Sequence, residues 1–518
     1  MSPDAHPDDF YSFEDRPTVP DAVASLAPAV ATEPEPESPP RQARSQARSF
    51  VAMIVIGGAV AQALGVTLQM PSQLGANDIS RWCTVWSLLE RGTYAIDDCP
   101  WQEKTQDKVL KVSPFEMAKE GEEPAKHYYS SKPPLLPTLI AGLLYPIRQA
   151  THVPLDARVS EDRNPRNVRK PDPDAPGGFK VVLETPPEPV RWNAYVFYFK
   201  PMIVLLNTVP LLAFLLVYAR LLDRYAPNDW AWTLSLFAAA WGTQLFVFGT
   251  TLNNHTVATY SAFFAIAPLL RIGEDGGTPG DFARAGFFGA FCACNELPAA
   301  LFGVLLFLLL LVKSPKRTLA FFVPAAIVPC AAFLATQYAA LGTFKPVYSE
   351  FGSASYNYEG SYWNTPLEFD WFDKHPEPTG VYVLHMLVGH HGIFALTPIF
   401  LFSFYAAFQQ AITRGRMAVL GGLTAVLSPA MVAFYAWKTH NYGGSTNGLR
   451  WLLWLAPFWL ALLPMGVAAG QNRRWVRVLS LAALLVSIFS AGYGLRMPWS
   501  HPWVLDAMEH LGLYHLHR

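Results

Sequence analysis

Charge is the scarcest property of this 518-residue sequence. Asp, Glu, Lys and Arg make 15% of the residues and the formal net charge is −1, whereas soluble domains carry about 25% charged residues. This composition excludes a disordered chain and a basic nucleic-acid-binding protein, and it gives no support for steering toward DNA. Hydrophobic residues make 51% of the chain and the mean hydropathy is +0.19. The sequence therefore predicts a polytopic membrane protein and not a soluble enzyme.

Cysteine is also scarce: there are five, without a Cys-x-x-Cys motif or a zinc-ligand spacing. Cys292 and Cys294 lie in an apolar segment, where we expect them to pack as small hydrophobic side chains. Cys83 and Cys99 flank a polar stretch and would pair only if it faces an oxidising compartment. The sequence contains neither Gly-x-Gly-x-x-Gly nor a P-loop, and no internal repeat of the kind that inverted-repeat transporters contain.

Composition divides the chain into five regions. The first 40 residues contain nine acidic residues and nine prolines, which predicts a disordered tail, and the arginines at 41, 44 and 48 would keep this tail in the cytoplasm. The expected regions are a disordered acidic cytoplasmic tail (1–48), a transmembrane core (49–344) that includes a first external loop (71–192), a second external loop (345–390), C-terminal transmembrane helices (391–497) and an external C-terminal tail (498–518).

Ten apolar runs predict about eleven transmembrane helices, hence an all-α fold. The run 285–312 is too long for one span, and Asn295-Glu296-Leu297-Pro298 in its middle places a charge and a proline where a helix breaks. The runs are 50–70, 195–219, 230–252, 256–270, 285–312, 318–344, 392–413, 417–437, 451–470 and 478–495.

A further apolar stretch, 133–147, is shorter than the roughly 20 residues that a span needs. If it does not span, twelve Lys and Arg residues in short loops fall in the cytoplasm, and the opposite short loops contain only Lys438 and Arg450. The positive-inside rule therefore predicts a non-spanning juxtamembrane helix here, a cytoplasmic N-terminus and an external C-terminus. Residues 71–192 then form a large first external loop, whose second half, 151–190, is rich in proline and charge and reads as a loose insertion.

Under this topology the unusual polar groups all fall on the external face. Asp78 precedes a predicted helix over Ile79–Arg91, where it serves either as an ordinary N-cap or as a general base at the mouth of a cleft, with Asn77 and Arg81 beside it. Lys132 precedes two prolines that can begin a helix, so it either snorkels at the interface or helps to bind an anion such as a lipid phosphate.

Four more positions are candidates. Asn254 and His255, which follow Asn253, lie between two apolar runs, in a polar turn or in a site. Glu296 lies in the helix break, and acids inside membranes are usually functional. Arg450 leads into a Trp-rich span as a headgroup anchor or a phosphate ligand. His390-His391 could be ligands, but two adjacent histidines seldom bind one metal together, so a role without a metal is favoured and no metal ligand is predicted.

These residues resemble a family. An acid just after the first span, Glu90-Arg91-Gly92, and Tyr129-Ser130-Ser131-Lys132-Pro133-Pro134-Leu135 resemble the GT-C glycosyltransferases that use polyprenyl-phosphate sugars, such as the lipid A aminoarabinose transferases and the protein O-mannosyltransferases. The stretch from Tyr442-Gly443-Gly444 to Gly448-Leu449-Arg450-Trp451 is similar to a Gly-Gly-to-Gly-x-Arg-Tyr stretch of bacterial members. The resemblance covers roughly residues 50–470 in architecture and short motifs in sequence.

The resemblance implies an inverting hexosyl- or pentosyltransferase in the bacterial inner membrane, with its active site on the periplasmic face. The donor would be a polyprenyl-phosphate sugar, and the acceptor a hydroxyl of a lipid, glycan or protein. By position, Asp78 would be the base and Lys132 would hold the donor phosphate. The sequence departs from the family where Asn77, Ser131 and Asn254-His255 stand in place of acids, so a divalent cation has little support.

The alternative from another class is a transporter or flippase of lipid-linked glycans. Such a protein would place its polar groups near the membrane midplane, whereas here they gather at one face. The sugar, the polyprenyl length and the acceptor are not encoded in any motif that the sequence displays.

Overall fold

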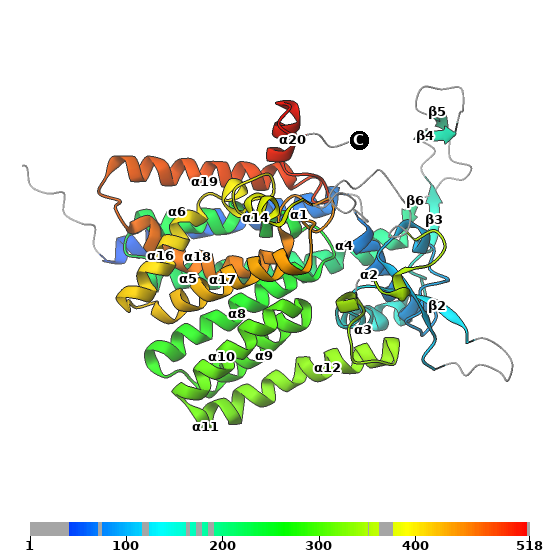
Figure 1. Cartoon of the computed structure of the whole chain (residues 1–518), viewed down its shortest axis with the longest axis horizontal. Helices are drawn as coiled ribbons and strands as arrows, with labels where there is room; N and C mark the ends of the chain where they lie inside the picture. The colour runs from blue at the N-terminus through cyan, green and yellow to red at the C-terminus, as the bar shows by residue number, and fades with distance from the viewer. Residues whose placement is uncertain are drawn as a thin grey trace, which may run out of the picture. The chain divides into compact units, whose positions relative to one another are not determined.

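The computed structural model describes residues 41–70, 75–115, 124–161, 166–171, 179–184, 191–350, 352–361 and 377–514. Helices dominate these ranges (Figure 1). Eight helical segments among them are long and apolar enough to cross a membrane. The main part of the chain is therefore an all-α polytopic membrane protein, as its composition predicted.

The eight long segments agree with eight of the predicted spans, although several contain more than one element. They are α1 (Arg41–Gln69), the continuous run of α4 (Ala194–Ile203), η2 (Val204–Thr208) and α5 (Val209–Tyr225), α6 (Asp229–Trp241) with α7 (Gln244–Phe248), α8 (Asn254–Asp275), α11 (Pro315–Arg317) with η4 (Thr318–Phe322) and α12 (Val323–Leu341), α17 (Ala418–Lys438), η7 (Arg450–Leu455) with α18 (Ala456–Ala468), and α19 (Arg474–Gly494).

The other three predicted spans fall on shorter helices. The long run breaks as expected: α9 (Pro279–Asn295) has 17 residues, Glu296 is extended with φ −138° and ψ 97°, and η3 (Leu297–Ala299) leads into α10 (Ala300–Lys313). The run 392–413 holds α15 (Ile393–Leu396) and the 14-residue α16 (Phe400–Thr413). A straight span takes roughly 20 residues. In the described ranges the eight long segments reach about this length, whereas these shorter helices do not.

The N-terminal boundary differs from the prediction. Residues 1–40 of the expected tail lie outside the described residues, whereas the helix begins at Arg41 and not near residue 49. Arg, Gln and Ala, which dominate residues 41–48, are good helix formers, so the helix extends into the basic segment.

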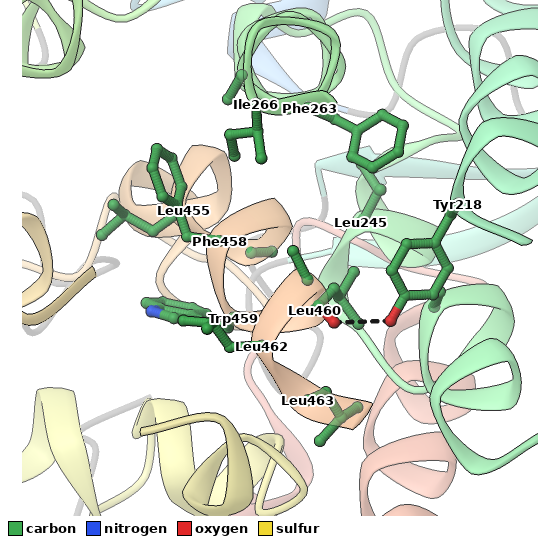
Figure 2. Close-up of a cluster of buried hydrophobic side chains, with 14 of the residues drawn as sticks. Tyr218, Leu245, Phe263, Ile266, Leu455, Phe458, Trp459, Leu460, Leu462 and Leu463 are labelled. Atoms are coloured by element: carbon green, nitrogen blue, oxygen red, sulfur yellow. Dashed lines mark hydrogen bonds between the residues drawn. The ribbon is translucent and has the colours of Figure 1, made fainter. Parts of the chain in front are cut away.

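Buried side chains of α18 form much of the helical core (Figure 2). Leu460, Leu462 and Leu463 are fully buried. Pro464 has no N–H, so it leaves the carbonyl of Leu460 without its helical partner. The Tyr218 hydroxyl on α5 donates to this carbonyl at 2.7 Å, which satisfies it inside the core.

Polar groups gather at both ends of the helices. At one end, the Arg416 guanidinium donates to Glu274 (Nε–Oε1 2.7 Å), Arg224 donates to Asp275 (Nη2–Oδ1 3.1 Å), and Arg317 donates to the Gly276 carbonyl (3.0 Å). These arginines belong to the loops for which we expect a cytoplasmic position. The candidate site residues lie at the other ends of the same helices, and the sidedness of the membrane stays a prediction.

The first external region contains two packed helices and a hairpin. α2 (Ala76–Glu90) packs against α3 (Leu135–Thr151), the predicted short helix. The Glu90 carboxylate accepts both Nε and Nη2 of Arg148, at 2.8 and 2.9 Å, and the N–H of Leu155 at 3.0 Å. Such two-pronged ion pairs fix orientation as well as distance, so α2 and α3 are held as one unit.

The hairpin and a cysteine pair complete this unit. After η1 (Gln102–Lys104), strand β1 (Lys108–Val112) pairs antiparallel with β2 (Lys126–Ser130). Cys83 and Cys99 are buried free thiols in hydrogen-bond contact, so the conditional disulfide is not formed in this structure. Cys292 and Cys294 are buried, as expected for packing.

The described parts of residues 151–190 are more ordered than a loose insertion. β3 (Arg158–Glu161) pairs with β6 (Arg191–Asn193), and β4 (Arg166–Pro171) pairs with β5 (Phe179–Glu184), both antiparallel. Charged residues and prolines dominate this segment, so the hydrophobic alternation that indicates strands is weak and the strands were not predicted.

The second external loop and the C-terminal tail contribute short helices. The loop has η5 (Val347–Glu350), η6 (Ala354–Tyr356) and α14 (Thr379–Leu387), and the tail has α20 (Trp503–His510). Residues 362–376 of the loop lie outside the described residues.

Candidate active site

Asp78 lies in the first turn of α2 and is 1% exposed. The structure corrects its expected role as N-cap: the helix begins at Ala76 with Gly75 as N-cap, and no side chain caps it. The Asp78 carboxylate instead accepts the N–H of Leu252 (2.5 Å) and the indole Nε1–H of Trp499 (2.7 Å). Two donors from distant parts of the chain therefore fix the position of this carboxylate.

The surroundings of Asp78 shift its proton affinity. Burial raises the pKa of Asp78 to about 6, although the Leu252 N–H, Arg81, the Trp499 indole and Arg450 all oppose this shift. A carboxylate with a pKa near 6 is mostly ionised at neutral pH and can still accept a proton readily. These are the properties of an efficient general base.

Arg81 is one turn further along α2 and connects Asp78 to the helical core. Its Nη1 donates to the carbonyl of Asn77 at 3.1 Å and to the Asn77 side-chain oxygen at 3.3 Å, and its Nη2 donates to the Asn254 side-chain oxygen. Burial lowers the pKa of Arg81 to about 10, and nearby Asp107 and Asp78 limit the decrease. The guanidinium therefore stays charged at neutral pH.

Lys132 follows β2 and faces Asp107, which precedes β1. The Lys132 ammonium lies 2.8 Å from an Asp107 carboxylate oxygen, and the Ser131 N–H donates to the Asp107 carbonyl at 3.0 Å. Burial lowers the pKa of Lys132, while Asp107 opposes this effect. The β1–β2 ladder thus delivers a paired lysine just before α3, which begins at Leu135 after the two prolines, as predicted.

The Ser130 hydroxyl strengthens this corner of the site. It accepts the Lys132 N–H at 3.2 Å and lies 2.6 Å from the Ser80 hydroxyl on α2. Ser80 also donates to the Asp107 carbonyl at 2.5 Å. The hydroxyls therefore link the Lys132 segment to the helix that carries Asp78.

Arg450 lies at the start of η7 and reaches the same place from the C-terminal half of the chain. Its guanidinium lies over the ring of Trp499, 4.7 Å from the centroid, and its Nη2 donates to the Gly443 carbonyl at 2.6 Å. Gly443 has φ +101°, a conformation that favours glycine. Trp499 thus contacts both Asp78 and Arg450, and it joins the carboxylate to a cation.

Glu296, Asn254 and His255 form the layer behind Arg81. The Glu296 carboxylate lies 2.5 Å from His255 Nδ1 and accepts the Tyr435 hydroxyl at 3.3 Å. The Asn254 amide donates to the Asn295 carbonyl at 2.5 Å and lies 3.5 Å from Glu296. The helix break therefore presents an acid that orients the polar start of α8.

The structure brings the eight predicted site residues into one polar network. They come from the start of α2, the segment before α3, the start of α8, the break after α9 and the start of η7: Asn77, Asp78, Arg81, Lys132, Asn254, His255, Glu296 and Arg450. The buried Asp78 carboxylate has Arg81 and Arg450 near it, and Lys132 lies in the same network through Asp107, so the site can bind an anion and accept a proton.

Three partners were missed by the sequence reasoning. Asp107, Trp499 and Tyr435 carry no motif, and each meets its partner across a long stretch of sequence. Trp499 lies 421 residues from Asp78. For the segment that carries Trp499, the sequence signals of an ordered structure are Pro498 and Trp499 themselves, which follow the last span.

A cavity lies at the opposite ends of the helices, away from these residues. It measures about 520 Å³ and is lined by the ends of α8 and α10 and by the start of α17, with Glu274, Lys313 and Arg416 at its polar side. None of the predicted site residues lines it.

No protein-family model matches this sequence, and no curated protein matches it either. Two solved structures of an oligosaccharyltransferase from Archaeoglobus fulgidus are similar to the fold. AglB in complex with an inhibitory peptide and a dolichol-phosphate is 12% identical, with a TM-score of 0.43 over 88% of this chain and 56% of that one. The apo form is 11% identical, with a TM-score of 0.41 over 88% and 57%. This chain thus spans little more than half the length of either protein, and similarity at this level is too low to assign a family.

Proposed function

We propose that this chain is a membrane glycosyltransferase that moves a sugar from a polyprenyl-phosphate donor to a hydroxyl group of a lipid, glycan or protein, with inversion at the anomeric carbon. The observation that carries the proposal is the buried Asp78 carboxylate, with its pKa of about 6, near the guanidinium groups of Arg81 and Arg450. The resemblance of the motifs around Asp78 and Lys132 to GT-C glycosyltransferases supports the same reaction class.

The proposed reaction is a single displacement. Asp78 takes the proton of the acceptor hydroxyl, and the oxygen attacks the anomeric carbon from the face opposite the phosphate. The bond between the anomeric carbon and the phosphate oxygen breaks, and the electron pair leaves with the polyprenyl phosphate. Fixed cations stabilise this developing charge more effectively than water does, because they need no reorganisation.

Lys132 and Arg450 are proposed to hold the donor phosphate. Both side chains are fixed before any donor binds, Lys132 by Asp107 and Arg450 by Trp499 and the Gly443 carbonyl. Preorganised cations lose little freedom when they bind an anion. Asp107 and Trp499 are therefore positioning residues.

The remaining predicted residues support the base. Asn77 and Asn254 hold the Arg81 guanidinium through their side-chain oxygens, and Glu296 with His255 holds the start of α8. Their proposed role is to keep Arg81 near Asp78, where its positive charge favours the ionised carboxylate. We expect the reaction to take place on the external face of the bacterial inner membrane.

The alternative is a flippase for lipid-linked glycans. The polar network lies at one end of the helices, and its carboxylate has a proton affinity suited to proton transfer, which favours the enzyme. A flippase would need a polar path through the helical core, where α18 is packed with leucine and aromatic side chains (Figure 2).

The test compares cells that lack the chain with cells that carry wild type, Asp78→Asn or Asp98→Asn. Asp98 is a matched control, because it lies in the same external region with its side chain 68% exposed. Mass spectrometry of the polyprenyl-phosphate sugars and envelope glycans should show an accumulating donor and one missing sugar in the deletion and in Asp78→Asn, but not in Asp98→Asn. Normal glycans in cells with a well-expressed Asp78→Asn chain would refute the proposed base. An accumulating donor confined to the cytoplasmic leaflet would indicate a flippase.

A further inference from the structure

A second cluster of ionisable side chains lies between the second external loop and the C-terminal part of the chain. Glu377 stands two residues before α14, His385 is on α14, and His390 is in the turn that follows. One donor atom from each residue lies within 4.8 Å of the other two. Glu377 Oε1 is 3.8 Å from His385 Nε2 and 3.9 Å from His390 Nε2. Three potential metal ligands thus converge within 14 residues of sequence.

From this geometry we infer that Glu377, His385 and His390 form a zinc site. Two imidazole nitrogens and one carboxylate oxygen are the ligand set of many Zn²⁺ sites that keep a fourth position for water. Ligands at about 2.0–2.1 Å from a tetrahedral ion lie roughly 3.4 Å apart, so these donor atoms need to approach by only a few tenths of an ångström up to about 1.4 Å. The inference does not depend on the proposed transferase activity.

The carboxylate is already oriented for this role. The hydroxyls of Tyr442 and Tyr514 donate to the two oxygens of Glu377. Each carboxylate oxygen keeps a second lone pair for a metal ion. Hydrogen-bonded partners of this kind usually accompany metal ligands.

The histidines have a matching arrangement. His390 Nδ1 lies 2.6 Å from His391 Nδ1, so a proton on His390 Nδ1 can be donated to His391, and in that tautomer Nε2 carries the lone pair that a metal ion would bind. The Nε2 atoms of His385 and His390 both lie near Glu377, but the two rings are stacked with centroids 3.9 Å apart, so binding one ion requires the rings to rotate out of this stack. His385 gives up only a long contact, 3.4 Å from the His390 N–H to its Nδ1, when that nitrogen carries the proton.

Gly389 makes the close approach of the two rings feasible. A Cβ at this position would lie 2.0 Å from His385 Nδ1 and 2.7 Å from the His385 Cα. Because the second contact is to backbone, rotation of the imidazole alone does not relieve it. Alanine at 389 should therefore displace the histidines without removing any ligand.

A zinc ion here would connect the second external loop to the candidate active site. The Tyr442 hydroxyl donates to the Glu377 carboxylate. Gly443, which follows Tyr442, accepts a hydrogen bond from the Arg450 guanidinium through its carbonyl. The ion would hold α14 against the segment that positions Arg450. Nitrogen ligands favour Zn²⁺ over Mg²⁺, which prefers oxygen ligands and retains its water.

The test measures metal binding to the full-length chain in detergent. After exhaustive chelation and dialysis against Zn²⁺, elemental analysis should find one Zn²⁺ per wild-type chain, and Co²⁺ in its place should give the visible spectrum of a tetrahedral ion. His385→Ala, His390→Ala and Gly389→Ala should lose the ion, while His440→Ala should keep it, since His440 is exposed and outside the cluster. Tyr514→Phe should weaken Zn²⁺ binding by about 10- to 100-fold.

Further measurements distinguish the loss of a zinc site from misfolding of the variants. Asp78→Asn should retain the ion, because the Zn²⁺ does not use the carboxylates of the candidate active site. Size-exclusion profiles must show that each variant is folded, and the wild-type Co²⁺ spectrum tests the site without any substitution. No bound Zn²⁺ in the wild type, a wild-type content of Zn²⁺ in folded His385→Ala and His390→Ala, or preferential binding of Mg²⁺ would each overturn the zinc site.

Discussion

Replacing Asp78 by asparagine separates the catalytic proposal from the stability of the fold. Asp78 is 1% exposed, and the change removes its buried charge while it keeps the size of the side chain. We expect transfer to fall by about 10²- to 10⁴-fold, the usual contribution of a general base. We also expect the pH dependence of stability to change, for a reason that follows from the burial of this carboxyl.

The magnitude follows from the raised pKa. A carboxyl whose pKa is 3.8 when exposed and about 6 in the folded chain favours folding in its protonated form. Its contribution is complete below pH 3.8 and is lost as the pH rises through 6. The loss corresponds to about 3 kcal/mol at about 1.4 kcal/mol per pKa unit. Asparagine cannot ionise and lacks this dependence.

A second effect is independent of pH. The Leu252 N–H and the Trp499 indole donate to different oxygens of Asp78, and asparagine replaces one of these oxygens by an NH2 group, so one of the two donors loses its acceptor. This loss costs about 1–3 kcal/mol at every pH. The variant should therefore be less stable than wild type near pH 4 and should gain on it by about 2 kcal/mol toward pH 7.5, since part of the effect already lies below pH 4.

The assay is thermal unfolding of both proteins in the same detergent between pH 4 and 8, with Asp98→Asn as control. The deciding quantity is the difference in unfolding temperature between variant and wild type as a function of pH. A difference that stays constant across this range would show that Asp78 does not titrate near pH 6, and the argument for a poised base would fail.

Three further predictions concern neighbours of this group. Trp499→Phe keeps a ring for Arg450 but removes the indole donor to the Asp78 carboxylate, so the pH-rate profile, which rises as the base ionises, should move to higher pH; an unchanged profile would contradict this contact. Lys132→Met should raise the donor KM more than tenfold and destabilise the chain by about 1–3 kcal/mol through the unpaired Asp107, and the double variant with Asp107→Asn should recover the stability but not the KM. Arg148→Ala should destabilise the external helices by about 1.5–3 kcal/mol, seen as faster proteolysis of that region, and equal proteolysis rates would argue against the coupling of α2 and α3.

Local signals were sufficient for the helices. The helix break at Asn295-Glu296-Leu297-Pro298 was predicted because a charge and a proline have the same effect in any context. The helix after Asp78 was predicted from periodicity, with its start three residues too late. The N-cap role of Asp78 was wrong because Leu252 and Trp499 bind its carboxylate, and no rule of local sequence includes them.

The composition of the site was also largely predictable, whereas its pairing was not. All eight candidate residues lie in the network, because polar side chains at the ends of apolar runs are costly to bury in lipid and pair with one another instead. The pairing of Lys132 with Asp107 depended on the β1–β2 hairpin. The link from Asp78 to Arg450 depended on Trp499 in the segment after α19. The strands within 151–190 were not predicted, because the segment has little hydrophobic alternation. Cys83 and Cys99 are free thiols in this structure, and their pairing in an oxidising compartment stays a prediction.

The sequence by itself determined an all-helical membrane chain, the positions of its apolar segments and the polar residues at their ends, because hydrophobic length and helix-breaking residues act locally. The tertiary structure decided that Asp78 is buried with a raised pKa, that Lys132 pairs with Asp107, and that Glu377 meets two histidines. These properties depend on desolvation and on distances between residues far apart in the chain, and only packing sets those.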